Sequence, residues 1–245
     1  MTSLVFWHGW GMSPTVWDTL IDELRELMPN EVHYDAIPLP GYGATALPGG
    51  DPLACWADTM MASVSGPVVL CGWSMGAILA LQAAARYPDK VERLVLFGGT
   101  PCFAAKADWA FGMPRDTGDT FRQGVRSDPK TTMRRFVSLF NRADSHGREI
   151  VRRLSRLEIP PVAVLDAGLD FLDHADFRML VPSIRQKNLL IHGENDPLMP
   201  PDAARWLEKN LPDASLALLP DVAHAPFLSE PQRCAALMTA FMEQA

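Results

Sequence analysis

What the chain lacks excludes several classes of protein. Its four cysteines, Cys55, Cys71, Cys102 and Cys234, are scattered, with no CxxC pair and no spacing typical of metal ligands. We therefore expect reduced thiols in a cytoplasmic protein and no metal site. No apolar run approaches the roughly 18 residues of a membrane span. The first residues, MTSLVFWHGWG, also lack the basic segment of a signal peptide.

Basic residues are fewer than acidic ones, and they are unevenly distributed. The chain has 22 Lys and Arg against 29 Asp and Glu, a net charge of −7, which argues against nucleic-acid binding. Residues 122–156, here called the basic segment, hold ten basic and three acidic side chains and are therefore +7. The remaining residues have 12 basic and 26 acidic side chains, or −14. The basic residues of the segment are Arg122, Arg126, Lys130, Arg134, Arg135, Arg142, Arg148, Arg152, Arg153 and Arg156.

Apolar runs and amphipathic stretches alternate along the chain. Strands are predicted at 4–7, 31–37, 68–71, 94–97, 188–191 and 216–219. Helices are predicted at 14–28, with Ser13 as N-cap, and at 52–64, 75–87, 202–210 and 230–243. This alternation predicts an α/β fold with a mostly parallel, doubly wound sheet. Because 104–181 is wholly helical in pattern, we expect a helical cap inserted into a core of residues 1–103 and 182–245.

The stretch VVLCGWSMGAILALQ reads as a buried strand that turns sharply into a helix, with Ser74 at the corner. Side chains two positions from such a corner would collide, and Gly72 and Gly76 remove those collisions. The G-x-S-x-G pattern between a strand and a helix is typical of a nucleophile elbow, which lifts a serine hydroxyl above the carboxyl edge of the sheet. We therefore predict that Ser74 is a nucleophile.

A serine nucleophile needs a base, and the base needs an orienting acid. His224 follows the last predicted strand, and the order Ser, acid, His of this fold favours it as the base. For the acid, Asp196 in the loop HGENDP is favoured because Pro197 after it suits a tight turn. Glu194 in the same loop and Asp221, three residues before His224, are the weaker alternatives. The other histidines, for which packing or solvated roles are expected, are His8, His33, His146, His174 and His192.

The HGWG turn, residues 8–11, follows the first strand. A glycine-rich turn at this point lets a backbone N–H reach the oxyanion of a tetrahedral intermediate, and the residue after the nucleophile supplies a second N–H. We therefore predict an oxyanion hole formed by the N–H groups of Trp10 and Met75.

The combination of HGWG, GWSMG, LVLFGGTPCFAAKADW, RRFVSLF, HGENDP and AHAPFLSEP resembles the BioH family of pimeloyl-[acyl-carrier protein] methyl ester esterases, on an α/β-hydrolase frame that covers nearly the whole chain. The resemblance implies a monomeric, cytoplasmic serine esterase without metal or cofactor. It would release methanol from the carrier-linked methyl ester in biotin biosynthesis. By resemblance, the acyl site is lined by Trp10, Ser74, Met75, Phe136, Val137, Ser138, Leu139, Phe140 and His224.

Two departures from the family pattern accompany this resemblance. The chain starts almost at the HGWG strand, so an N-terminal hairpin is missing or reduced and one sheet edge should differ. Phe140 also stands where a polar residue is expected. Two other classes stay open: an α/β hydrolase acting on other small esters or a triad-using lyase of menaquinone synthesis, and a non-catalytic ligand receptor on the same frame.

An acyl carrier protein is acidic, so an enzyme that binds one needs a cationic surface beside its pocket. Arg148, Arg152 and Arg156 recur at every fourth residue and are predicted to form one exposed stripe of a helix. We expect Arg135, Arg148 and Arg152 to contact the carrier protein. A merely solvated charged face is the alternative.

Overall fold

A six-stranded, wholly parallel sheet forms the centre of the protein in the computed structural model, which describes residues 2–28 and 31–244. The strand order is β2-β1-β3-β4-β5-β6. The strands are β1 (Ser3–Trp7), β2 (His33–Ile37), β3 (Val68–Trp73), β4 (Val91–Phe97), β5 (Lys187–Gly193) and β6 (Ala214–Leu219). All six predicted strands are thereby confirmed, and β2 and β6 form the two edges.

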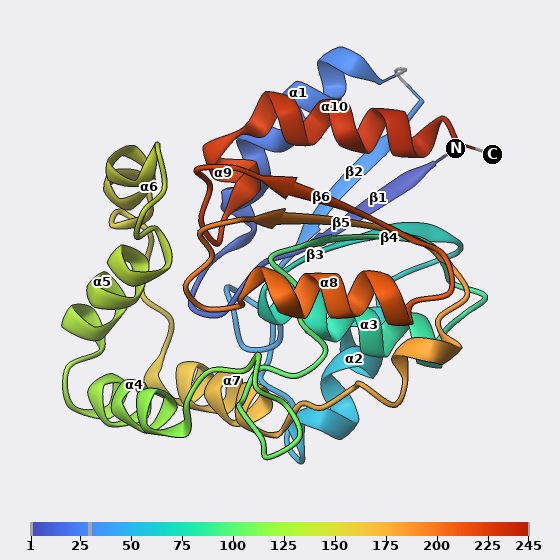
Figure 1. Ribbon diagram of the computed structural model, residues 1–245. Helices are drawn as coiled ribbons and strands as arrows, with labels where there is room; N and C mark the ends of the chain where they lie inside the picture. The colour runs from blue at the N-terminus through green and yellow to red at the C-terminus, as the bar shows by residue number, and fades with distance from the viewer. Residues whose placement is uncertain (1, 29–30, 245) are drawn as a thin grey trace.

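Helices cover both faces of the sheet. On one face lie α1 (Asp18–Leu27), α9 (Pro226–Ser229) and α10 (Pro231–Met242), and on the other α2 (Pro52–Ala62), α3 (Met75–Arg86) and α8 (Pro201–Asn210) (Figure 1). Because both faces are covered, β3 is buried at every position and reads as one apolar run, VVLCGW. The predicted helix 14–28 begins with a short 3-10 turn, Pro14–Trp17, before α1.

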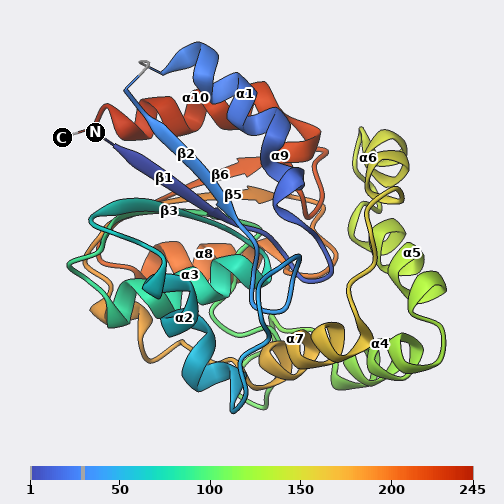
Figure 2. The same ribbon diagram turned by 180° about the vertical axis from the view of Figure 1, so that it is seen from behind.

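Four further helices lie beyond the carboxyl ends of the strands rather than on a sheet face (Figures 1 and 2). They are α4 (Arg115–Ser127), α5 (Pro129–Phe140), α6 (Gly147–Leu154) and α7 (Val162–His174). Where the chain leaves and rejoins the core, the Phe177 N–H donates to the Pro101 carbonyl at 2.8 Å. The predicted inserted helical cap on a doubly wound sheet is therefore observed.

The first part of the insertion is not helical, which corrects the prediction of helix from about residue 104. Residues 102–113 instead form short bridges, Ala104 with Met113 and Lys106 with Trp109. The Trp109 indole is buried and donates to the Cys102 carbonyl at 2.9 Å. The aromatic side chains of this segment thus pack into a separate small hydrophobic cluster. The first helix of the cap begins only at Arg115.

Part of the basic segment holds the cap together. Arg122 on α4 pairs with Asp166 and Asp173 on α7, and Arg126 pairs with Asp166 at 2.6 Å. These contacts tie α4 to α7 (Figure 1). No helix in the described ranges is both long enough and apolar enough to cross a membrane.

Candidate active site

Ser74 stands at the corner between β3 and α3 with φ 57° and ψ −119°, a strained conformation for a residue other than glycine. A Cβ on Gly72 would lie 2.5 Å from the Gly76 carbonyl oxygen. A Cβ on Gly76 would press against the carbonyl oxygens of Trp7 and His8, at the end of β1. Both glycines are therefore required by close backbone approach, as the G-x-S-x-G pattern predicts.

The substitution Gly76→Ala should lower the free energy of unfolding by about 2–3 kcal/mol, because the added methyl meets backbone atoms that cannot rotate away. Denaturant unfolding followed by tryptophan fluorescence measures this change. Gly49→Ala is the matched control, since a Cβ at Gly49 meets nothing within 4 Å, and should change stability by less than about 0.5 kcal/mol. Equal stability of the two variants would contradict the close packing described at the corner.

His224 lies in the loop between β6 and α9, with its side chain fully buried. Its Nδ1 is 2.7 Å from Asp196 Oδ2. The backbone of His224 is fixed from two sides: its carbonyl accepts from the Trp73 indole at 2.8 Å, and its N–H donates to the Phe140 carbonyl at 3.2 Å. Its other ring nitrogen, Nε2, is buried and has no hydrogen-bond partner among the described residues.

Asp196 follows β5 and is buried. Its Oδ1 accepts hydrogen bonds from the N–H groups of Leu198 and Met199, both at 2.9 Å. Burial alone would raise the pKa of the Asp196 carboxyl, but the adjacent His224 and His192 and the Met199 N–H hold it below its ordinary value. The carboxylate is therefore ionised at neutral pH. The alternatives Glu194 and Asp221 are both exposed, and neither contacts His224 through a described hydrogen bond.

A second imidazole also faces Asp196, which the sequence interpretation did not anticipate. His192 Nε2 donates to the Met199 carbonyl at 2.7 Å and lies 3.3 Å from Asp196 Oδ2. Burial lowers the pKa of His192, so it is neutral at neutral pH. The sequence signal was present: His192 and Asp196 are four residues apart where β5 ends, and a tight turn brings such positions together.

The HGWG loop lies directly against Ser74, because a Cβ on Gly9 would be 3.2 Å from the Ser74 Cβ. The Trp10 N–H, and the Met75 N–H at the start of α3, donate to no acceptor among the described residues. His8 is buried, which lowers its pKa to about 4, and its neutral Nε2 accepts from the Leu39 N–H at 3.1 Å. The loop is thus held by buried hydrogen bonds while two N–H groups remain available near Ser74.

Ser74 and Trp10 line the same small, mostly apolar cavity of about 20 Å³. The Trp10 indole is fixed by a 2.8 Å hydrogen bond to the Leu165 carbonyl, and Gly168 leaves room for its ring. Both anchoring residues lie on the cap helix α7, so the cap shapes the cavity above Ser74. The other residues that line it are Phe103, Met113, Gly118, Phe121, Phe136, Leu169, Leu172, Asp173 and Leu198.

The five residues 136–140 do not share one role. Phe136 lines the Ser74 cavity and stacks edge-on against Trp10, with ring centroids 4.8 Å apart. Phe140 is fully buried, and its ring packs against those of Trp73 and His224. Val137 lines a neighbouring cavity instead.

Two of the five lie away from the cavity. Ser138 is exposed and Leu139 is half-buried, and neither lines the Ser74 cavity. Of the five residues predicted to line the acyl site, Phe136 is the one that lines the Ser74 cavity among the described residues. The helical period of 3.6 residues turns positions 138 and 139 away when 136 and 140 face inward.

The predicted arginine stripe is shorter than expected. Arg148 and Arg152 are exposed on α6, but this helix ends at Leu154, so Arg156 lies on the turn that follows it. Arg135 is exposed on α5, and none of these four arginines forms an ion pair within residues 2–28 and 31–244. Across the same part of the chain, no group of three or more His, Cys, Asp or Glu side chains could hold a metal ion.

Comparisons with known proteins agree with this architecture. The Alpha/beta hydrolase family model matches residues 4–237. Among solved structures, an esterase from Exiguobacterium antarcticum superposes with a TM-score of 0.87 at 21% identity, covering 100% of this chain and 92% of that one. A bromoperoxidase from Bacillus anthracis gives 0.88 at 20% identity, covering 99% and 92%. At these identities the structures show the fold alone.

Curated relatives are more similar in sequence. A pimeloyl-[acyl-carrier protein] methyl ester esterase of Aromatoleum aromaticum is 41% identical over 244 residues, covering 96% of each chain. A protein of the same name from Nitrosomonas europaea is 35% identical over 234 residues, covering 94% of this chain and 91% of the relative. The chain therefore belongs to the alpha/beta hydrolase family and, within it, to the family of pimeloyl-[acyl-carrier protein] methyl ester esterases.

Proposed function

We propose that the protein is a serine carboxylesterase that hydrolyses the methyl ester of pimeloyl-[acyl-carrier protein], releasing methanol, in biotin biosynthesis. The relatives that carry this name cover nearly the whole chain. The observation that carries the proposal is the buried pair of His224 Nδ1 and Asp196 Oδ2, 2.7 Å apart, with the free His224 Nε2 available as base for Ser74. The residues proposed as catalytic are Ser74, Asp196 and His224.

The reaction has two half-reactions in this proposal. The Ser74 hydroxyl attacks the ester carbonyl carbon while His224 Nε2 takes its proton, and Asp196 stabilises the resulting imidazolium. The oxyanion that forms accepts hydrogen bonds from the N–H groups of Trp10 and Met75. Collapse of this intermediate breaks the bond to the methoxy oxygen, which takes the proton from His224 and leaves as methanol. Water, deprotonated by His224, then attacks the acyl-enzyme and frees the carboxylic acid and Ser74.

The apolar lining of the Ser74 cavity favours an uncharged ester group over an ionised carboxylate. Its walls are aromatic and aliphatic, with Phe136 and Leu169 on cap helices and Leu198 on the core. Asp173 also lines it, but its carboxylate is paired with Arg122 on α4. An uncharged methyl ester therefore enters without the loss of hydration that an ionised carboxylate would suffer there.

We further propose that Arg135, Arg148 and Arg152 bind the carrier protein. All three are exposed and extend from α5 and α6, which lie on the same side of the molecule as the carboxyl ends of the strands (Figure 1). Cations without internal partners keep their charge available to an acidic carrier, and the attraction speeds association in a salt-dependent way. The arginines of α4 differ from these three, because they form ion pairs with carboxylates of α7.

Reversing two of these charges tests the proposal. The double variant Arg148→Glu with Arg152→Glu should raise KM for the carrier-linked methyl ester by about tenfold at low salt, since electrostatic steering contributes factors of this order. KM for methyl butyrate should be unchanged. Initial rates of methanol release measure both.

The matched control reverses two exposed cations outside the cap that also form no ion pair among the described residues, Arg185→Glu with Arg233→Glu, and so changes the net charge equally. It should leave both KM values unchanged. Equal effects of the two double variants, or a loss with methyl butyrate as well, would contradict carrier binding by α6.

We also propose a cytoplasmic location, where acyl carrier proteins are loaded and thiols stay reduced. All four cysteines are free and three of them are buried. A net charge of −7 argues against nucleic acid as a partner. That the protein is a monomer stays a prediction, which light scattering of the purified chain tests.

A further inference from the structure

The cavity that contains Ser74 is too small for the substrate proposed above. Its volume of about 20 Å³ is little more than one water molecule needs, whereas a seven-carbon acyl chain needs several times that space. The chain must also continue outward to the carrier protein, which cannot enter. The space between Ser74 and the surface must therefore widen when substrate binds.

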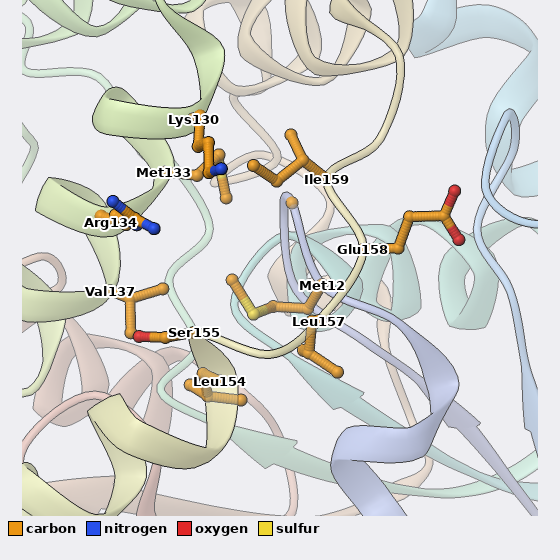
Figure 3. A pocket seen from close by; sticks show the side chains of 11 residues that line it. Met12, Lys130, Met133, Arg134, Val137, Leu154, Ser155, Leu157, Glu158 and Ile159 are labelled. Carbon is orange, nitrogen blue, oxygen red and sulfur yellow. The ribbon is translucent and has the colours of Figure 1, made fainter.

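A second cavity, of about 110 Å³, lies beside α5 (Figure 3). We call it the α5 cavity. Lys130, Met133, Arg134 and Val137 reach it from α5, and the residues after α6 close it from the opposite side (Figure 3). The full lining is Gly11, Met12, Lys130, Met133, Arg134, Val137, Leu154, Ser155, Leu157, Glu158 and Ile159.

The two cavities approach each other at α5 and at the HGWG loop. On α5, Met133 faces the α5 cavity and Phe136, less than one turn further on, faces the Ser74 cavity. Met133 also packs directly on Gly11, so that a Cβ there would overlap its terminal methyl. Gly11 adjoins Trp10, which lines the Ser74 cavity. Met133 is thus the adaptable side chain at this boundary, since an unbranched methionine adjusts readily to altered packing.

The mouth of the α5 cavity has the charge expected for the outer end of the substrate. Lys130 and Arg134 are exposed there and form no ion pair among the described residues. The carboxylate of Glu158, the one acidic side chain of the lining, points away from the cavity (Figure 3). Carrier proteins hold their acyl groups through a pantetheine arm that ends in a phosphate, and cations at the mouth complement that group.

Two other openings fit an acyl chain and its phosphate-bearing arm less well. A groove of about 540 Å³ behind Met12 is lined by prolines, glycines and Tyr42, with Glu158 as its only charged residue. A polar pocket beside Asp173 holds Arg115, Asp119 and His174, of mixed charge, and an apolar chain gains little from such a lining.

We propose that the α5 cavity is the passage for the acyl chain and the pantetheine arm of the carrier-linked substrate, with Met133 as the side chain that moves aside. This inference rests on the proposed function. It assigns to Met12, Met133, Leu157 and Ile159 a role in binding the arm, and to Lys130 and Arg134 a role at its phosphate.

Blocking the passage after folding tests this. Ser155 is exposed and lines the α5 cavity, so we would introduce Ser155→Cys in a Cys55→Ser background, because Cys55 is the one native cysteine that is not buried. Labelling with pyrene maleimide then fills the cavity of an already folded protein. Ser13→Cys and Arg115→Cys, labelled in the same way, fill the groove and the polar pocket and are the matched controls.

Three methyl esters separate the outcomes: methyl-pimeloyl carrier protein, methyl-pimeloyl pantetheine without the protein, and methyl butyrate. Label at position 155 should lower kcat/KM at least tenfold for both long substrates. It should lower kcat/KM by a clearly smaller factor for methyl butyrate, which leaves no arm in the passage. The control labels should change none of the three by more than twofold.

Several results would contradict the assignment of the α5 cavity as the passage. A loss with the carrier-linked ester alone would mean that the label blocks protein docking and not a passage. No loss, an equal loss for all three esters, or a selective loss with a control label would also overturn the inference. If the unlabelled enzyme fails to hydrolyse the carrier-linked ester, the proposed function itself fails.

Discussion

Replacing Ser74 by alanine should abolish ester hydrolysis, with kcat falling by about 10³- to 10⁶-fold, the range found when such a nucleophile is removed from other serine hydrolases. The reason is geometric. The elbow places Ser74 against the HGWG loop and directly before the Met75 N–H, and no other hydroxyl among the described residues lines its cavity.

The variant should also fold normally. The Ser74 side chain makes no capping hydrogen bond to α3, so its loss leaves no buried group unsatisfied. Thermal unfolding of Ser74→Ala should therefore match that of the wild type, while methanol release is lost. Retention of more than about one per cent of the wild-type kcat, on the scale of those losses, would show that Ser74 is not the nucleophile.

Asp196→Asn should lower kcat by up to about 10⁴-fold, the effect of the same change in serine proteases of a different fold. The hydrogen bonds explain the direction. If the asparagine oxygen keeps its bonds from the N–H groups of Leu198 and Met199, its NH₂ group faces His224 Nδ1. That nitrogen must then accept, so the proton moves to Nε2 and the imidazole can no longer take the Ser74 proton.

His192 makes the same substitution more costly. Its Nε2–H, which donates to Met199, lies 3.3 Å from Asp196 Oδ2 and would face a second donor. The control is Asp221→Asn, since Asp221 is exposed and only three residues before His224. The control should keep wild-type kcat. Loss of activity with Asp221→Asn and not with Asp196→Asn would show that the acid was assigned incorrectly.

The positions of the strands and the serine corner could be predicted because local sequence determines them. The run VVLCGW can only be a buried strand, and the glycines beside Ser74 are needed where β3 and α3 approach β1. The positions of His224 and Asp196 followed from a general property of parallel sheets, whose carboxyl ends share one edge. The structure brings these two side chains into contact, with His224 Nδ1 2.7 Å from Asp196 Oδ2.

The cap was harder to predict because its structure depends on tertiary contacts. Residues 102–113 have aromatic side chains that occur in helices and loops alike. In the structure this segment is a loop, in which Trp109 packs on Trp206. The end of α6 at Leu154 could not be read from the arginine spacing, which continues to Arg156. The contact between His192 and Asp196 depends on a turn whose geometry the sequence alone does not fix.

We expect the enzyme to act on an ester carried by an acidic protein. The most direct test compares kcat/KM of the wild type for methyl-pimeloyl carrier protein with that for dimethyl pimelate, which has the same acyl chain and no carrier. At low ionic strength the carrier-linked ester should be favoured by about tenfold or more, and added salt should reduce that advantage. Equal kcat/KM values for the two esters, or a preference for dimethyl pimelate at every salt concentration, would show that the enzyme does not recognise the carrier protein.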